Sequence, residues 1–359
     1  MLLRWLSLPI LPSESSHFQH KLLYLLIFGN FIAKIMYSKD ELNELINRAV
    51  GNITCSEEAE RLYAPVRYIL SLGGKRLRPL VTLMSCNVFS DRAEEALMPA
   101  VGLEIFHNFT LVHDDIMDNA PVRRKSPTVH EKWNANQAIL SGDVMAFIAN
   151  EYMAATPPAT FQKVFKLYNR TAVEVCIGQQ MDMDFEKRQY VSRDEYLRMI
   201  ELKTAVLLAA CMKCGAIIGG ASDRDSDLMY QFGRNLGLAF QIQDDILDVY
   251  GDPALFGKKI GGDIVENKKT FLLIKALELS KGDTGQRLNT LLGSPETDPE
   301  VKIRAVTAIY DELGVKEISE NLAAEFINKA FGYYESVSAT TERKEPLMQL
   351  AAAMTGRDR

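Results

Sequence analysis

The chain is poor in cysteine and offers no framework for disulfide pairing. Its five cysteines lie at Cys55, Cys86, Cys176, Cys211 and Cys214. The odd count and the irregular spacing exclude a small disulfide-stabilised secreted protein and favour a reducing compartment, the cytoplasm. Cys211 and Cys214 form a CxxC, but neither a second CxxC nor a histidine pair lies nearby. We therefore expect ordinary buried thiols, with a redox or zinc site as the alternative.

A basic surplus and a long apolar run are also missing. Lys and Arg number 41 against 47 Asp and Glu, a net charge of -6, so we expect no nucleic-acid binding. The apolar run 22–35 is broken by Gly29, Asn30 and Lys34 and is shorter than the roughly 18 to 20 residues that span a bilayer. We expect no stable membrane insertion. Residues 1–35 are interpreted as an extension before a start at Met36, or as an amphipathic segment that touches a membrane.

What the sequence does contain is helical periodicity. Ser38 and Glu41 form a capping box that predicts the start of a first helix. Long stretches of helical period follow, at 93–118, 135–155, 159–184, 204–219, 225–250 and 315–337. Alternating strand-like stretches and low-complexity linkers are missing after Met36. The sequence therefore predicts one all-α domain over 36–359, built from antiparallel helices.

Two similar acidic motifs each end a long apolar helix. The first is DDIMD, from Asp114 to Asp118, and the second is DDILD, from Asp244 to Asp248. The first and last Asp of each motif lie four residues apart, on one helix face, where like charges repel. Helix stability does not explain such a pattern, but oxygen ligands for Mg²⁺ do. A solvated helix end explains one such motif; two of them favour a metal site.

Basic residues follow glycines or the acidic motifs. Lys75, Arg76 and Arg78 come after a Gly-Gly pair at a predicted helix start, where backbone N–H groups and guanidinium groups suit a phosphate. Arg123 and Arg124 follow the first motif. Lys203 and Thr204 open a predicted apolar helix, and Gln241 precedes the second motif by three residues. Three lysines follow that motif: Lys258, Lys259 and Lys268. Each alone is typical of a solvated surface, whereas together they indicate a phosphate-binding site.

These motifs, in this order, resemble the trans-isoprenyl diphosphate synthase family over almost all of the chain from Met36. The matching strings are GGKRLRP, LVHDDIMDNAPVRR, GQQMD, KT, FQIQDDILDVYGD and GKKIGGD. The resemblance implies a bundle of antiparallel helices around a central cavity, usually in a homodimer. It implies a Mg²⁺-dependent, head-to-tail condensation of isopentenyl diphosphate with dimethylallyl, geranyl or farnesyl diphosphate. Three Mg²⁺ ions would hold the allylic diphosphate between the two motifs.

The resemblance also assigns roles. The implied metal ligands are Asp114, Asp118, Asp244 and Asp248, with Asp182 and Asp263 in the outer metal shell. The implied catalytic residues are Lys203, Thr204, Gln241, Asp115 and Arg123. The pocket for isopentenyl diphosphate is implied to contain Lys75, Arg78, His107 and Arg124. The remaining substrate contacts are implied to come from Arg123, Gln179, Lys203, Thr204, Gln241, Lys258 and Lys268. His113 is expected to pack, and a catalytic triad is not expected.

Product length is expected to depend on Phe109 and Thr110, five and four residues before Asp114. In the family, two aromatic residues at these positions usually stop growth at fifteen carbons. Only one is aromatic here, which favours a twenty-carbon, geranylgeranyl product, with farnesyl or longer products as alternatives. The C-terminal Arg357 and Arg359 are candidates for closing the site.

Three other functions are weighed. A terpene cyclase would usually carry an NSE- or DTE-type second motif, and DDILD is not one. A non-catalytic subunit of a heteromeric synthase tends to lose its acidic motifs, and both are intact. A calcium-binding or scaffold protein would leave the basic residues around the motifs unexplained.

Overall fold

The structure is a computed structural model that describes residues 36–53, 59–252, 260–294 and 298–356. The predictions for residues 1–35, Cys55, Lys258, Lys259, Arg357 and Arg359 lie outside these ranges. The chain from Met36 onward forms one compact unit. Among the described residues, no helix is both long enough and apolar enough to cross a bilayer.

The fold is all-α, as predicted. Helices before the second motif are α2 (Lys39–Gly51), α3 (Glu60–Ser71), α4 (Leu77–Phe89), α5 (Leu97–Met117), α6 (Val129–Lys132), α7 (Ala135–Ala154), α8 (Pro158–Glu186), α9 (Arg193–Ile200) and α10 (Val206–Ile218). Then come α11 (Asp223–Tyr250), α13 (Gly262–Val265), α14 (Phe271–Leu279), α15 (Gly282–Leu292), α16 (Pro299–Glu312), α17 (Val315–Glu335) and α18 (Thr341–Thr355). The shorter elements are η2 (Ala93–Ala96), η3 (Glu201–Ala205), β1 (Val122–Arg123) and β2 (Ser126–Pro127).

Local sequence explains where the site-bearing helices begin. The predicted capping box at Ser38 opens α2, and a second one, with Ser192 and Glu195, opens α9. The Ser222 side chain accepts the backbone N–H of Asp225 and caps α11. These caps satisfy N–H groups that have no partner inside the helix.

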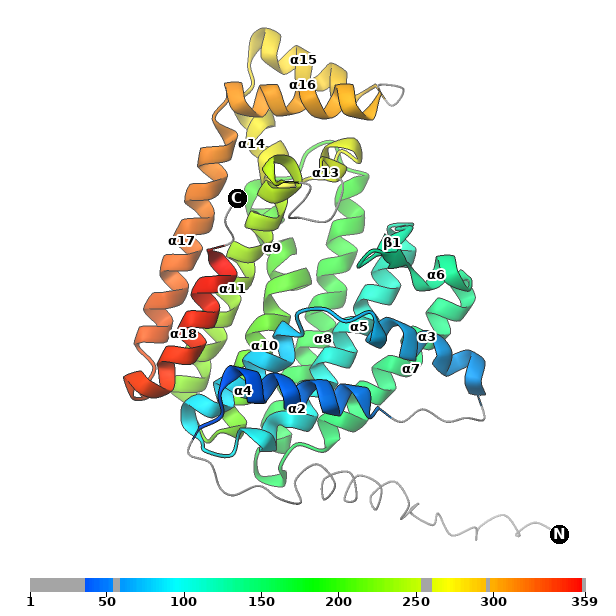
Figure 1. Cartoon of the computed structure of the whole chain (residues 1–359). Helices are drawn as coiled ribbons and strands as arrows, with labels where there is room; N and C mark the ends of the chain where they lie inside the picture. The colour runs from blue at the N-terminus through cyan, green and yellow to red at the C-terminus, as the bar shows by residue number, and fades with distance from the viewer. Residues whose placement is uncertain (1–35, 54–58, 253–259, 295–297, 357–359) are drawn as a thin grey trace, which may run out of the picture. The chain divides into compact units, whose positions relative to one another are not determined.

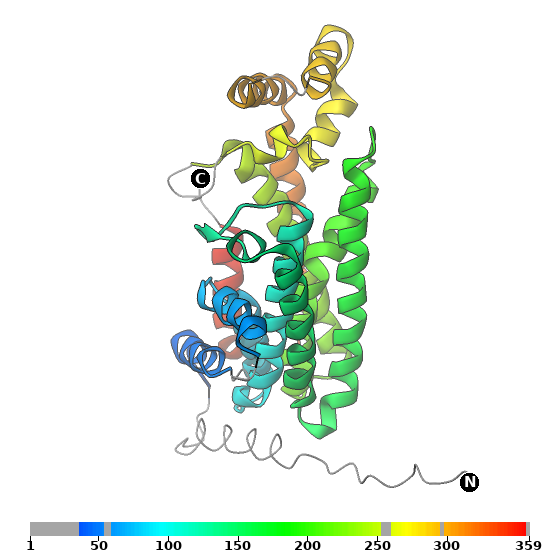
Figure 2. The same cartoon turned by 90° about the vertical axis from the view of Figure 1, so that its right-hand side faces the viewer.

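Helix α10 lies at the centre of the bundle, because all but one of its 13 residues are buried. It packs against α4, α8 and α11, while α5 packs against α7 and α11 against α17 (Figures 1 and 2). Cys211 and Cys214 are buried free thiols in α10, as predicted. The hairpin that follows α5 and the helix α13 that follows α11 lie toward the same end of the bundle in Figure 1. The ends of the two helices with acidic motifs therefore point the same way.

Two features differ from the sequence prediction. Residues 122–127 form an antiparallel hairpin of two residues per strand, too short to show an alternating pattern. Lys203 and Thr204 do not open an α-helix, because they lie in η3, a π-helical turn that continues into α10. Lys203 of η3 packs very closely against α8, at Gly178. A Cβ atom at Gly178 would lie 2.2 Å from the Lys203 backbone nitrogen, so only glycine lets η3 approach α8 this closely.

Candidate active site

The first acidic motif ends α5, and its second aspartate is engaged inside the protein. Asp115 is 1% exposed. Arg123 of β1 donates to both of its carboxylate oxygens from Nε, at 2.8 and 2.9 Å, and its Nη2 lies 2.7 Å from Oδ1. Burial disfavours the charge of Arg123, but the hydrogen bond and charge of Asp115 outweigh it and raise the Arg123 pKa. Asp115 thus holds the arginine that follows the motif.

Asp114 faces a lysine from a different part of the bundle. Lys203 Nζ lies 3.1 Å from Oδ1 of Asp114 and donates to Oδ2 of Asp182 on α8 at 2.6 Å. Oδ1 of Asp114 is buried and accepts no hydrogen bond. Burial works against the charge of Lys203, but Asp114 and Asp182 together raise its pKa. The lysine is therefore a permanent cation that joins α5, α8 and η3.

Asp118 caps the C-terminus of α5 and feels the charge of Asp114. Burial and then Asp114 raise the pKa of Asp118 to about 6, although Lys203 and Lys268 act in the opposite direction. The nearby lysines therefore do not fully offset the combined effect of burial and of the repulsion from Asp114. A bound divalent cation would remove that repulsion.

The second motif ends α11, and its second aspartate is again held by hydrogen bonds inside the protein. Asp245 is 6% exposed, and its oxygens accept hydrogen bonds from Tyr196 Oη at 2.6 Å and Gln241 Nε2 at 3.0 Å. Asp244, in contrast, makes no hydrogen bond or ion pair with a described residue. Asp248 Oδ2 accepts the backbone N–H of Asp263 at 3.0 Å. In both motifs the second aspartate is held by side-chain hydrogen bonds, while the side chain of the first accepts none from a described residue.

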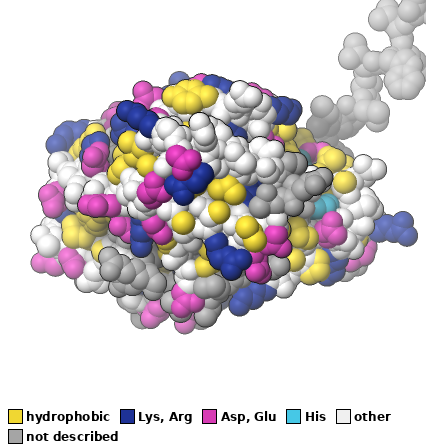
Figure 3. Space-filling view, turned by 90° about the horizontal axis from the view of Figure 1, so that it is seen from above, with side chains coloured by type: hydrophobic (Ala, Val, Ile, Leu, Met, Phe, Trp, Pro, Cys, Tyr) yellow, Lys and Arg dark blue, Asp and Glu magenta, His cyan; other side chains and the backbone are white. Residues whose placement is uncertain are grey.

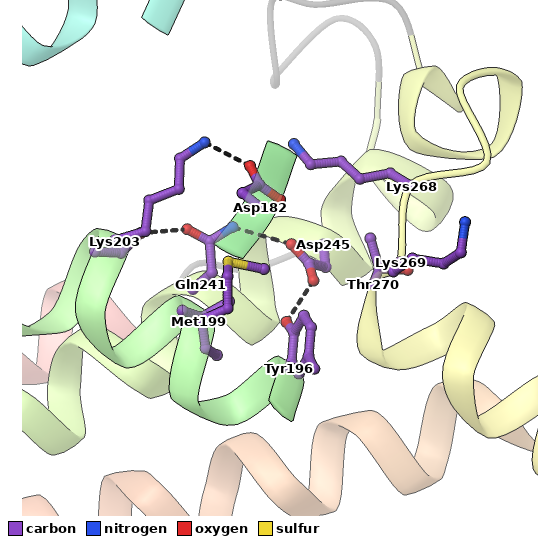
Figure 4. A pocket seen from close by; sticks show the side chains of 11 residues that line it. Asp182, Tyr196, Met199, Lys203, Gln241, Asp245, Lys268, Lys269 and Thr270 are labelled. Carbon is purple, nitrogen blue, oxygen red and sulfur yellow. Dashed lines mark hydrogen bonds and ion pairs between the residues drawn. The ribbon is translucent and has the colours of Figure 1, made fainter. Parts of the chain in front are cut away.

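A small cavity of about 40 Å³ lies beside the second motif (Figure 4). Asp182, Lys203, Thr204, Gln241, Asp245 and Lys268 are among the residues that line it. Thr204 Oγ1 donates to Gln241 Oε1 at 3.1 Å. Because Lys203 lines this cavity and also contacts Asp114, the two acidic motifs border one site.

Lys268 belongs to the same site, where cations and carboxylates are packed closely. Burial opposes its charge, but Asp263, Asp182 and Asp245 outweigh it and raise the pKa of Lys268. The Lys268 ammonium lies 3.9 Å from Asp263 Oδ1. Burial raises the pKa of the Asp263 carboxyl to about 8, with Lys268 opposing the shift. From above, side chains of both signs intermingle on the surface (Figure 3).

The basic residues around the Gly-Gly pair form a second group, next to the hairpin. Arg124 donates to the carbonyl of Gly73, and its guanidinium lies against Gly74. A Cβ atom at Gly74 would lie 2.9 Å from Arg124 Cζ, and its φ of +129° favours glycine. Lys75 is exposed, whereas Arg76 donates to Asn47 Oδ1 at 2.6 Å. Gly74 therefore gives Arg124 its place beside the start of α4.

Arg78, His107 and Glu104 are three further titratable groups near these residues, and the sequence pointed to only the first two. Arg78 Nε is buried and has no hydrogen-bond partner, and burial lowers the pKa of Arg78. Burial, followed by the charge of Arg78, lowers the pKa of His107 well below its usual value, so His107 is neutral at pH 7. Glu104 of α5 is also buried near Arg78, and burial raises its pKa. Sequence reasoning missed Glu104, although a lone acid inside an apolar run was its signal.

A larger, mostly apolar cavity of about 490 Å³ lies between α5, α7 and α8. Phe109 lines it together with Phe106 and Tyr168. The Phe106 ring contacts both of these rings, with centroids 5.6 Å from Phe109 and 5.5 Å from Tyr168. Thr110 does not line the cavity; its hydroxyl donates to the carbonyl of His107 at 2.7 Å.

Two other predicted residues lie at the margins. Gln179 of α8 donates to Met117 Sδ at 3.6 Å, next to the end of the first motif, and does not line the small cavity. His113 packs between helices, as expected, with its ring 4.8 Å from the Phe109 ring and its Nε2 3.1 Å from the carbonyl of Ile139.

Comparison with known proteins decides the family. The polyprenyl synthetase profile matches residues 59–309. The chain belongs to the polyprenyl synthetase family. It is 37% identical to a geranylgeranyl diphosphate synthase of Sulfolobus acidocaldarius over 330 residues, which cover 90% of this chain and 99% of that one. Curated relatives also include a geranylfarnesyl diphosphate synthase. Like these relatives, this polyprenyl synthetase is a prenyltransferase.

Solved structures agree with this assignment. A crystal structure of a geranylgeranyl pyrophosphate synthase aligns with a TM-score of 0.86 and 41% identity, covering 90% of this chain and all of that one. A polyprenyl synthase from Caulobacter crescentus, in complex with calcium and isoprenyl diphosphate, aligns with a TM-score of 0.79 and 29% identity. That alignment covers 92% of this chain and 100% of the other.

Proposed function

We propose that this polyprenyl synthetase joins isopentenyl diphosphate to an allylic diphosphate with the help of Mg²⁺, and that its product is geranylgeranyl diphosphate. One observation carries the proposal. Lys203 contacts Asp114 of the first motif and lines the same cavity as Asp245 of the second. Two acidic helix ends and two partly buried lysines around one cavity suit a substrate that is both anionic and bound to cations.

The acidic residues fit a divalent cation, although they do not form a complete cage. Among the described residues, no three Asp, Glu, His or Cys side chains are close enough to hold a metal ion by themselves. Mg²⁺ ordinarily binds through one or two carboxylates, waters and substrate phosphate oxygens, so an incomplete protein shell suits it. Oδ1 of Asp114 is buried and accepts no hydrogen bond, and the pKa of Asp118 is raised; both observations support this fit. Asp114, Asp118, Asp244 and Asp248 would hold the ions, which neutralise the departing diphosphate when bound.

The remaining polar residues suit the proposed chemistry. The C–O bond of the allylic diphosphate breaks, and the bonding electrons leave with diphosphate while an allylic cation forms. Arg123, Lys203 and Lys268 stabilise the negative charge of that leaving group. The oxygen atoms of Thr204 and Gln241 lie on the cavity wall, where they stabilise the positive charge. The double bond of isopentenyl diphosphate then attacks the cation, and the released diphosphate accepts the proton lost from the new product.

The basic pocket beside the hairpin suits the second substrate. Arg78 has a buried Nε without a partner, and His107 is a neutral donor and acceptor beside it. With Lys75 and Arg124 they would bind the diphosphate of isopentenyl diphosphate. Lys258 keeps its predicted role at the allylic diphosphate as part of this proposal.

The larger cavity supports a long apolar product. Its volume of about 490 Å³ and its lining by Phe106, Phe109 and Tyr168 suit an isoprenoid tail. With a single aromatic residue just before the first motif, we propose a product of twenty carbons, limited by Phe109.

A homodimer is also part of the proposal. Helices α7 and α8 expose several large apolar side chains, among them Leu140 at 55%, Phe147 at 68% and Val173 at 60%. An apolar face of this kind marks an interface between subunits. We propose that a second copy of the chain covers it, and that the enzyme acts in the cytoplasm.

The test is a prenyl-transfer assay with the full chain. Purified protein is incubated with labelled isopentenyl diphosphate and dimethylallyl, geranyl or farnesyl diphosphate, in Mg²⁺ or in EDTA, and the dephosphorylated products are separated by chromatography. We expect a twenty-carbon product in Mg²⁺ and none in EDTA.

Asp114→Ala and Asp244→Ala should each reduce turnover by about 10²-fold or more. The matched control is Asp227→Ala, which removes an exposed carboxylate of the same helix α11 that pairs with Lys213. Normal turnover in Asp114→Ala would contradict the proposed metal site.

A further inference from the structure

Tyr196 is a buried side chain of the site, and none of the sequence motifs assigns it a role. It belongs to α9, is 1% exposed and lines the small cavity (Figure 4). Its hydroxyl donates to Asp245 Oδ2 at 2.6 Å. Its ring contacts Phe271 of α14, with centroids 6.2 Å apart. The ring is thus held by the core while the hydroxyl is directed at the inner aspartate of the second motif.

The hydrogen bond from Tyr196 leaves one oxygen of Asp245 for a second donor. That oxygen, Oδ1, accepts from Gln241 Nε2 at 3.0 Å. An ionised carboxylate accepts hydrogen bonds only, so the group of Gln241 that faces it must be the NH₂ end of the amide. The orientation of the Gln241 amide, which coordinates alone often leave ambiguous, is thereby set by chemistry.

The amide orientation determines what Thr204 can do. With its NH₂ group turned to Asp245, Gln241 presents Oε1 to Thr204, whose Oγ1 donates to it at 3.1 Å. A threonine hydroxyl has one proton, and this bond uses it. The cavity wall therefore presents the lone pairs of Thr204 and the carbonyl oxygen of Gln241. Both are negative ends of dipoles, and they stabilise a positive charge that develops beside them.

The series of hydrogen bonds begins and ends on the same helical stretch. Tyr196 and Thr204 lie on one continuous helical stretch, α9 followed by η3, and α11 supplies the two residues between them. The series of hydrogen bonds therefore runs from α9 across α11 and back to η3. Among the described residues, no hydrogen bond joins Thr204 directly to Tyr196.

We propose that Tyr196 is a positioning residue, which acts through Asp245 and Gln241 to keep the oxygen of Thr204 directed at the allylic cation. The inference rests on the proposed function. It assigns different roles to two neighbouring aspartates of the second motif. Asp245 would orient the oxygen atoms that stabilise the allylic cation, whereas Asp244 would bind a metal ion.

The first test compares two substitutions of buried tyrosines. Tyr196→Phe removes one hydroxyl at the site. Tyr334→Phe is the matched control, because Tyr334 is also fully buried and its hydroxyl donates to the carbonyl of Lys344 at 2.9 Å, between α17 and α18. We expect both variants to melt at similar, slightly reduced temperatures. The kcat of Tyr196→Phe should fall about tenfold with little change in the KM of either substrate, while Tyr334→Phe keeps the wild-type kcat. Equal kcat values in the two variants would overturn the inference.

The second test measures coupling between Tyr196 and Thr204, which share no direct hydrogen bond. Thr204→Val removes the terminal hydroxyl but keeps the side-chain shape. If Tyr196 acts through Thr204, the double variant Tyr196→Phe/Thr204→Val has the kcat of Thr204→Val alone. Losses that multiply would show that Tyr196 acts independently and would overturn the inference.

A wild-type protein that forms no prenyl product would overturn the proposed function itself, and this inference with it. An active wild type with an equally active Tyr196→Phe would overturn the inference only.

Discussion

The ammonium of Lys203 lies 3.1 Å from Oδ1 of Asp114, although the two residues belong to η3 and α5. The contact places a cation from the centre of the bundle at the first acidic motif. The ammonium also lies 2.6 Å from Asp182 of α8. Three helical elements therefore converge on one positive charge, and removing that charge should affect the chemistry more than the fold.

Replacing this lysine should slow turnover strongly. We expect Lys203→Met to lower kcat by about 10²- to 10³-fold, because a fixed cation would no longer stabilise the departing diphosphate. Steady-state rates at saturating Mg²⁺ measure the effect. The control is Lys213→Met, which removes the lysine of α10 that pairs with the exposed Asp227. A loss of less than threefold in Lys203→Met would argue against a role at the leaving group.

The metal-free protein should become less stable as the pH rises through the titration of Asp118. Its pKa is raised from 3.8 to about 6 in the folded state, by burial and by Asp114. The folded state therefore binds this proton more tightly than the unfolded state, so the stabilisation is complete below pH 3.8 and is lost by pH 6. Asp118→Asn should remove this loss and stabilise the protein in EDTA at pH 7 by about 1 kcal/mol or less, since the carboxyl is only partly buried and solvent screens the repulsion.

Melting temperatures in EDTA at pH 4.5 and pH 7 test the Asp118 prediction. Addition of Mg²⁺ with inorganic diphosphate should reverse the order of the two proteins, because only the wild type keeps the full set of carboxylates. Identical pH dependence in wild type and Asp118→Asn would contradict the assignment.

Product length should respond to Phe109 and not to Thr110. Phe109 lines the apolar cavity, so Phe109→Ala should shift the main product beyond the wild-type length by at least one five-carbon unit. Thr110 bonds to its own helix and does not line the cavity, so Thr110→Ala should keep the wild-type profile. Chromatography of dephosphorylated products gives both results. Lengthening in Thr110→Ala alone would place the limit on a different helix face.

Two glycine substitutions should have opposite effects. At Gly178 a Cβ atom would lie 2.2 Å from the backbone of Lys203, so Gly178→Ala should push η3 away from α8 and reduce both stability and turnover. At Gly332, in α17, a Cβ atom would meet nothing within 4 Å, so Gly332→Ala should stabilise the protein by about 0.5–1 kcal/mol. Thermal melts and rates check both. Wild-type turnover in Gly178→Ala would show that η3 tolerates displacement.

The helices and the acidic motifs were predictable because local pattern determines them. Apolar periodicity located α5, α7, α8 and α11, and Ser38 with Glu41 marked the start of α2. The close approach of η3 to α8 at Lys203 was not predictable, since it depends on Gly178 of another helix. Tyr196 was missed for the same reason, because its hydroxyl meets Asp245 across 49 residues of sequence.

The inner aspartates, Asp115 and Asp245, have partners within the protein, Arg123 for the first and Tyr196 with Gln241 for the second. These hydrogen bonds stabilise the fold, so Asp115 and Asp245 would be retained for structural reasons even without catalysis. A descendant of this chain that no longer turned over substrate, but kept its shape as a companion subunit, would be expected to lose Asp114 and Asp244 first. Loss of Asp114 and Asp244 together with retention of Asp115 and Asp245 would then distinguish an inactive relative from an active enzyme.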